Sequence, residues 1–247
     1  MFIFKRNKVV LDTFTDNVNV FHYAKPEKAI RYFPEWWKTI PVKTQSLTPY
    51  GLQYDIDTMA SCPGFIDHFK NSIVLPLWSD LIIETSDNGD YKYKYADDSS
   101  PPIVSHSDKQ YGFFFQDKIH LKICYPWLFQ EKTGINFVCV EPTWNLLNKE
   151  FPGKILPGTV QYQMNVSGNI NMFFPKINNR IKLEFGTPLY QLFPQSEKDI
   201  EIKTHLVSSE EYKNLNKISS YRFKFNKNYS FKKKTFGTCP FNSILKK

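Results

Sequence analysis

The stretch Leu183-Glu184-Phe185-Gly186-Thr187-Pro188-Leu189-Tyr190-Gln191-Leu192-Phe193-Pro194 decides the fold class. Apolar and polar side chains alternate on both sides of its Gly-x-Pro corner, and a period of two is typical of a strand with one buried face. Gly186 permits a bend, and Pro188 can begin a strand because the first residue needs no ladder N–H. The stretch therefore predicts two strands, at 181–184 and 189–193, joined by a barrel corner.

Similar segments recur along the chain from residue 73 onward. Further strands are expected at 73–77, 81–85, 91–95, 119–123, 136–140, 159–164, 170–174 and 200–203. The Gly168 turn between Tyr162 and Phe173 predicts a hairpin. About ten strands with short antiparallel links and no long helix between them predict a mainly β fold at the α+β margin. We expect jelly-roll or barrel-like antiparallel sheets.

The first seventy residues have a different pattern, with short helical segments. We expect one or two strands over 8–23, a helix over 26–33 that Pro34 ends, a helical turn over 35–40 and a helix over 61–71. Residues 1–212 then form a single β-rich domain, with its short helices within 25–71. A capping box formed by Ser208 and Glu211 predicts a two-turn helix through Lys217.

The charge of the chain is segregated. All 24 acidic residues lie at or before Glu211, whereas ten basic residues follow Tyr212. Residues 1–212 therefore contain 22 basic and 24 acidic groups, a net charge of −2, although the whole chain has a formal charge of +8. This distribution argues against a nucleic-acid binder that uses its whole surface. It indicates a local basic, aromatic C-terminal extension over 213–247.

The cysteines and the absence of targeting signals indicate an intracellular protein. The N-terminus lacks the apolar segment of a signal peptide, and eighteen apolar residues never run together. The four cysteines are widely spaced, without a CxxC pair, which predicts free thiols. We expect a cytoplasmic location and no membrane contact.

One spacing has metal chemistry attached to it. His106 and Asp108 lie two residues apart, so on a strand they would project to the same side. With His205 they would form the two-histidine, one-carboxylate face of a non-haem iron oxygenase that uses Fe(II) and 2-oxoglutarate. Arg180 or Lys182 would then bind the 2-oxoacid. A loop-like segment precedes His106, so the simpler interpretation is a chance spacing, and we expect the three side chains to be dispersed.

Two segments combine aromatic rings with exposed or basic positions. Trp36 and Trp37 are candidates for a partner groove, although paired tryptophans also fasten a short helix to a sheet, which is the interpretation favoured here. Segment 221–234 interleaves rings with Arg222, Lys224, Lys232, Lys233 and Lys234. Such a strand can follow a phosphate backbone weakly. An edge strand kept soluble by lysines is favoured over nucleic-acid binding.

Five motifs lie at 31–38, 61–67, 74–80, 126–129 and 185–189. Together they resemble a family of uncharacterised proteins from cyanophages and other marine T-even-like phages, and the resemblance covers roughly residues 8–212. It implies the host cytoplasm, or the virion, as the location. It implies a phage origin and supplies no catalytic residue. No nucleotide-binding or hydrolase signature is present either. We therefore expect a phage-encoded, non-catalytic binding or assembly protein without a cofactor. Its partner would be an unknown protein or phage component. The alternative is the cupin-like, metal-dependent oxygenase.

Overall fold

The computed structural model describes residues 8–110, 112–146, 151–163 and 166–225. Its strands are β1 (Val9–Thr15), β2 (Glu27–Lys28), β3 (Lys43–Leu47), β4 (Gln53–Asp57), β5 (Ile73–Pro76), β6 (Leu81–Thr85), β7 (Tyr91–Tyr95), β8 (Ile103–Ser105), β9 (Lys118–Ile123), β10 (Leu128–Glu131), β11 (Phe137–Val140), β12 (Lys154–Ile155), β13 (Gly158–Val160), β14 (Ile170–Pro175), β15 (Asn179–Leu183), β16 (Pro188–Pro194) and β17 (Ile200–Leu206). The helices are α1 (Val18–Tyr23), α2 (Glu35–Thr39), α3 (Pro63–Lys70), α4 (Thr143–Leu146) and α5 (Ser209–Phe225). Short 3-10 turns are η1 (Ala29–Tyr32), η2 (Met59–Ser61), η3 (Asp108–Gln110) and η4 (Gly112–Phe115).

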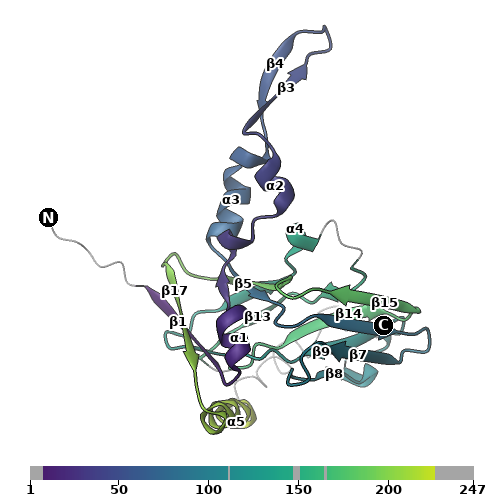
Figure 1. Cartoon of the computed structure of the whole chain (residues 1–247), viewed down its shortest axis with the longest axis vertical. Coiled ribbons are helices and arrows are strands. Elements are labelled where there is room, and N and C mark those ends of the chain that lie inside the picture. The colour runs from purple at the N-terminus through teal and green to yellow at the C-terminus, as the bar shows by residue number, and fades with distance from the viewer. Residues whose placement is uncertain (1–7, 111, 147–150, 164–165, 226–247) are drawn as a thin grey trace, which may run out of the picture.

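The strands form four sheets in a body and one hairpin outside it (Figure 1). The body sheets have the strand orders β10-β1-β17, β13-β11-β16-β5-β2, β12-β14-β9-β8 and β15-β6-β7. We call the second the central sheet and the third the β9 sheet. Among the described strands every pairing is antiparallel except β1 with β17. The predicted β-rich class with a few short helices is confirmed, and a strand is present at each position expected between 73 and 203, although the one expected over 159–164 is only Gly158–Val160.

A single hydrophobic core joins these sheets. It contains buried side chains from Val9 in the first strand to Ile200 in the last, and Trp127, Phe129 and Phe174 are among its largest members. Alternation produces it locally: in β1 the side chains of every second residue are buried. The indole N–H of Trp127 donates to the Ala24 carbonyl at 2.9 Å, so this polar group is satisfied inside the core.

The Gly186 corner is present as predicted. Gly186 has φ +77°, in the left-handed region that glycine enters without a Cβ penalty, and β16 begins at Pro188. The Ser208 cap is also confirmed, because its Oγ accepts the Glu211 N–H at 3.2 Å. The helix that it begins extends to Phe225, well beyond Lys217.

Two predictions for the N-terminal region were wrong. Residues 18–23 form α1 instead of a strand, because the Asn17 side chain accepts the Val20 N–H at 3.1 Å and so caps a helix. Residues 26–33 do not form a continuous α-helix. Glu27 and Lys28 instead pair with β5 at the edge of the central sheet, and η1 follows. Sheet pairing satisfies these backbone groups outside a helix.

The hairpin expected around Gly168 is also wrong. β13 pairs with β11 and β14 pairs with β9, so the two segments belong to different sheets. Gly168 has another role, because a Cβ there would lie 2.4 Å from the Phe129 ring. Glycine occupies this position because the backbone passes close to an aromatic side chain, and not because the chain turns there.

The predicted edge strand at 221–225 is not present, because these residues lie in α5. The Ser208 cap initiates a helix, and its hydrogen-bond pattern continues through the alternating aromatic and basic residues. Arg222 and Lys224 therefore lie on helix backbone, whereas Lys232, Lys233 and Lys234 lie outside the described residues. Helix α5 lies at the end of the body opposite the hairpin (Figure 1).

Candidate functional site

A narrow neck of aromatic side chains connects the body to the hairpin. Its ring contacts centre on Phe65 of α3, which lies within 5.0–5.8 Å of three tryptophan rings: Trp36, Trp37 and Trp144. Trp37 also stacks on Phe33 at 4.2 Å. These contacts fill the space between α2, α3 and the edge of the central sheet. Trp36 and Trp37 therefore pack against α3 and against the small buried cluster that includes Val74 of β5, whereas their role in a partner groove stays a prediction.

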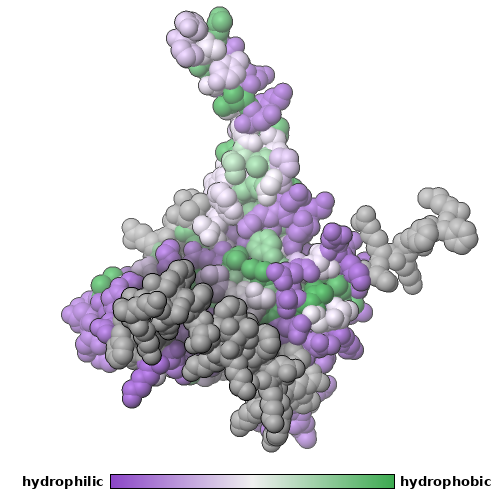
Figure 2. Space-filling view, turned by 180° about the vertical axis from the view of Figure 1, so that it is seen from behind, coloured by the Kyte–Doolittle hydropathy of each residue, from purple (hydrophilic) through white to green (hydrophobic). Residues whose placement is uncertain are grey.

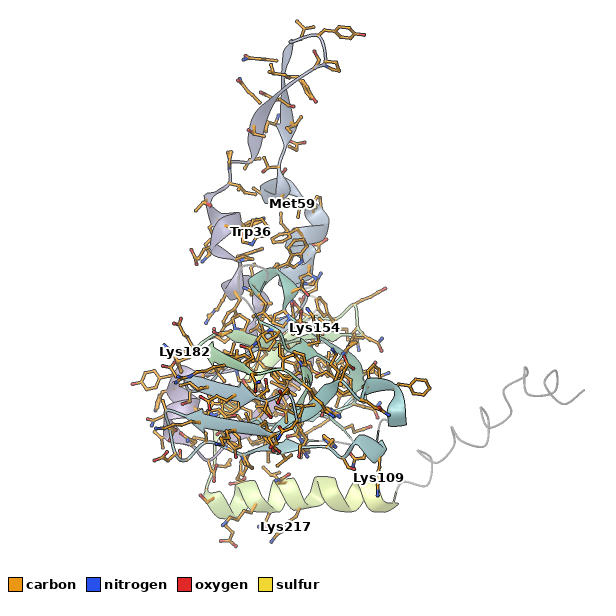
Figure 3. All side chains as sticks on the ribbon, turned by 90° about the vertical axis from the view of Figure 1, so that its right-hand side faces the viewer. Trp36, Met59, Lys109, Lys154, Lys182 and Lys217 are labelled. Atoms are coloured by element: carbon orange, nitrogen blue, oxygen red, sulfur yellow. The ribbon has the colours of Figure 1, made fainter. Side chains whose placement is uncertain are left out.

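The tryptophan N–H groups strengthen the neck. The Trp37 indole N–H donates to the Met59 carbonyl at 2.9 Å, and the Trp36 indole N–H lies 3.5 Å from the Trp144 carbonyl. Trp36 and Met59 mark this region in Figure 3. Both indoles are half-buried, so part of each ring is covered by its neighbours in the neck.

The hairpin of β3 and β4, here called the arm, projects from this neck away from the body (Figure 1). Every strand residue of the arm except Ser46 is exposed. Thr58 joins the arm to the neck, because its backbone N–H donates to the Val42 carbonyl at 3.0 Å and its side chain caps η2. A two-stranded hairpin without other cover is marginally stable in water, so an arm held in this way has to be maintained by its base.

The register of the arm gives it two unlike faces. Lys43 pairs with Asp57 and Gln45 with Asp55, so one face is mainly polar, and the Leu47 side chain opposite Gln53 is its apolar member. Thr44 pairs with Ile56 and Ser46 with Tyr54, which places apolar side chains on the other face. Leu52 continues that face toward the tip with 68% of its surface exposed. The space-filling view shows hydrophobic residues distributed up the arm (Figure 2).

A cavity with a volume of about 600 Å³ lies in the body. Segments between β8 and β9, around β13 and before β14 surround it, together with Cys139 of β11 and Tyr190 of β16. It therefore lies where the β9 sheet meets the central sheet. We call it the body pocket.

Two histidines stack on the wall of the body pocket. The imidazoles of His106 and His120 have centroids 4.4 Å apart and planes inclined by 23°. The His106 Nδ1 contacts the Gln110 side chain. Burial and the neighbouring His106 lower the pKa of His120, and a hydrogen bond with Asn171 opposes this effect. The His120 ring is therefore held mainly neutral at pH 7.

The potential nucleophiles of the body pocket are kept protonated. Burial raises the pKa of the Cys139 thiol to about 11, against a hydrogen bond with Tyr190 that lowers it. Burial also raises the pKa values of the Tyr162 and Tyr190 hydroxyls well above their ordinary value. A thiolate is the reactive form of cysteine, so this environment suits binding better than nucleophilic catalysis.

No protein-family model matches this chain, and neither a curated protein nor a solved structure matches it. The functional assignment therefore depends on the residues and their geometry.

The residues of the alternative iron site lie in different surroundings. His205 of β17 contacts Asp12 through Nε2 at 2.8 Å and stacks on Phe14 at 4.9 Å. His106 contacts His120 instead, and Asp108 begins η3 rather than continuing a strand. Within the described part of the chain no three His, Cys, Asp or Glu side chains are grouped so that they could hold a metal ion.

The residues proposed for the 2-oxoacid belong to β15 and already have acidic neighbours. Arg180 pairs with Glu84 at 3.4 Å, and Lys182 lies 3.8 Å from Glu184. The described cysteines Cys62, Cys124 and Cys139 are free thiols. No helix in the described ranges is long and apolar enough to cross a membrane.

The sequence interpretation missed both the arm and the body pocket. Weak alternation over 52–57 was the available signal for the arm, yet it resembles that of any half-buried strand. The polar positions of the pocket also alternate, at Ser167, Asn169 and Asn171, but the alternation does not reveal which sheet lies opposite.

Proposed function

We propose that this chain is a phage-encoded, non-catalytic assembly protein that binds a partner protein through the apolar face of its arm. The jelly-roll-like body is its scaffold, and the partner is another phage component or a protein of the host. The observation that carries the proposal is a hairpin held away from the body with its apolar face uncovered.

The physical argument rests on what an exposed apolar strand face costs. Removing apolar side chains from water is favourable, so a folded chain on its own tends to bury them. The arm instead presents Leu52, Tyr54 and Ile56 on one face, with Tyr50 at the tip 91% exposed. Contiguous exposed apolar surface of this kind marks interaction sites. Both edges of the arm also have unpaired backbone groups, which can add to a partner's sheet.

The neck supports the same role. A rigid base lowers the entropy that would be lost when a mobile hairpin is ordered on its partner. Stacked rings and indole hydrogen bonds supply that rigidity next to Thr58. The arm is therefore already positioned for docking before the partner arrives.

The proposed origin and location follow from the resemblance to marine phage proteins. The protein is proposed to act in the host cytoplasm or in the virion, without membrane contact. Weak nucleic-acid contact through the basic residues after Tyr212 is compatible with this role and is secondary to the arm. The oxygenase alternative is not proposed, because the described donor atoms do not gather around a common position.

Photo-crosslinking tests the proposal. A photoreactive p-benzoylphenylalanine is placed at Tyr54, on the apolar face of the arm, and the protein is expressed in infected host cells. We expect one dominant crosslinked protein, identified by mass spectrometry. The same group at Tyr23, which is exposed on α1 of the body, is the control and should give no such product.

The identified partner is then purified for affinity measurements. Ile56→Lys should weaken binding by about tenfold or more, because the variant has to bury a charge where an apolar side chain docked. Gln45→Lys on the opposite face should leave the affinity unchanged. Equal affinity of Ile56→Lys would contradict the proposal. A crosslink only to a second copy of the chain would assign the arm to self-association instead.

A further inference from the structure

One wall of the body pocket is a row of polar side chains on β9, on β14 and on the segment that leads into β14. Ser167, Asn169 and Asn171 alternate with buried Val166, Gly168 and Ile170, so the three polar residues project to one side. On the neighbouring strand His120 and Lys122 alternate with Ile119, Leu121 and Ile123, which are buried in the core. Asn171 and Lys122 are direct cross-strand partners.

The described residues of the wall include a positively charged side chain and no negatively charged one. Lys122 supplies a cation, and no aspartate or glutamate is among the described residues that line the pocket. Lys122 forms no salt bridge with a described residue, whereas Lys118 on the same strand pairs with Asp117 at 2.7 Å. The other titratable lining groups are His106, His120, Cys139, Tyr162 and Tyr190. None of them is an anion at pH 7 in this environment, so the ammonium group has no compensating charge within the pocket.

We propose that the body pocket binds a small organic phosphate, with the phosphate group placed against Lys122 and the polar row. A phosphate has three terminal oxygens and needs several donors, which the hydroxyl of Ser167, the amides of Asn169 and Asn171 and the ammonium group of Lys122 provide. This binding activity is independent of the arm.

The shape of the pocket indicates that the ligand is larger than inorganic phosphate. A volume of about 600 Å³ lies within the range of sites for organic ligands. Leu156, Pro157 and Val160 add apolar surface to the lining, and the Leu156 N–H donates to the Asn171 carbonyl at 2.9 Å beside the polar row. The bound molecule therefore combines a phosphate with an organic group of the size of a sugar or nucleoside.

Calorimetric titration of the purified full chain tests this inference. The probes are ribose 5-phosphate, ribose and citrate, at neutral pH and low salt. We expect saturable binding of ribose 5-phosphate at one site per chain and no binding of ribose. Lys122→Met should weaken the binding of ribose 5-phosphate by about tenfold or more, because a charge-assisted contact is lost.

Two further variants keep the test decisive. Lys182→Met removes a lysine from β15, outside the pocket, and should leave binding unchanged. Asn171→Asp places a carboxylate in the polar row with little change in shape, so it should also abolish binding if Lys122→Met does not fold. Absence of saturable binding, or equal binding by Asn171→Asp, would overturn the inference. Citrate binding as tightly as ribose 5-phosphate would also overturn it, because the site would then select carboxylates.

Discussion

The absence of a Cβ at Gly168 allows the backbone to pass close to buried aromatic rings. The chain passes over the rings of Phe129 and Tyr125 at this residue, and an added Cβ would lie 2.4 Å from the first ring and 3.1 Å from the second. Phe129 is fully buried and stacks on Tyr162 at 4.8 Å, so its ring cannot move aside freely. The glycine therefore permits the segment that bears the polar row to approach the core.

Gly168→Ala should destabilise the protein by about 1–3 kcal/mol, because the new methyl group overpacks a rigid aromatic contact. Chemical denaturation monitored by tryptophan fluorescence measures this change. Gly64→Ala in α3 is the matched control, because no atom lies within 4 Å of its added Cβ. We expect the control to be neutral or slightly stabilising, since alanine favours helix. Equal stability of the two variants would show that Phe129 yields.

At the scale of the elements, the neck that supports the arm is held together by a small hydrophobic cluster. Its satellite cluster of buried residues is separate from the main core and has four members: Ala29, Phe65, Phe69 and Val74. A small cluster can open without unfolding the rest of a protein. The arm and the neck should therefore form a unit less stable than the body.

Phe65→Ala should loosen this unit selectively. The variant removes the ring that contacts three tryptophans, and large-to-small changes of buried aromatics typically cost about 3–5 kcal/mol. We expect faster amide exchange and proteolytic cleavage within 41–59, with smaller changes in the body strands. Phe114→Ala is the control, because that ring is 91% exposed. A uniform loss of protection over the whole chain would show that neck and body unfold together.

Local sequence signals were sufficient for most strands between 73 and 203 and for the Ser208 cap, because both depend on neighbours within a few residues. They were insufficient where contacts between residues far apart in the sequence determine the local structure. Glu27 and Lys28 became a strand through pairing with β5, and Gly168 contacts a ring 39 positions away in the sequence. The arm could not be identified for a related reason. Almost every strand residue of the arm is exposed, so no buried face marks these strands in the sequence.

At the scale of the whole molecule, the half-buried imidazoles of His68 and His120 couple folding to pH. Burial is the main cause that lowers the pKa of His68 and of His120. Between the ordinary histidine pKa of 6.5 and the lower folded values, the unfolded chain binds more protons than the folded chain. The contribution of these two histidines to the free energy of unfolding is therefore fully present above about pH 6.5, and it decreases as the pH falls below that value.

The melting temperature should fall when the buffer is changed from pH 7.5 to pH 5.5 at constant ionic strength. Asp97 does not contribute in this window, because its folded pKa lies below the ordinary carboxyl value of 3.8. A double variant, His68→Asn with His120→Asn, should show a smaller change over the same interval. Differential scanning calorimetry makes the comparison. A pH dependence that is unchanged in the double variant would assign the effect to other groups.

The parallel pairing of β1 with β17 has a consequence for synthesis of the protein. Val9 pairs with Ile200 and Thr15 with Leu206, so β1 can complete this pairing only after β17 has been synthesised. Contacts between such distant residues slow folding, since a long loop has to close first. A ribosome adds about 5–20 residues per second, so β1 remains without this neighbour for roughly ten seconds or longer. During that interval the nascent chain exposes one edge of β1, and a chaperone can bind to this edge.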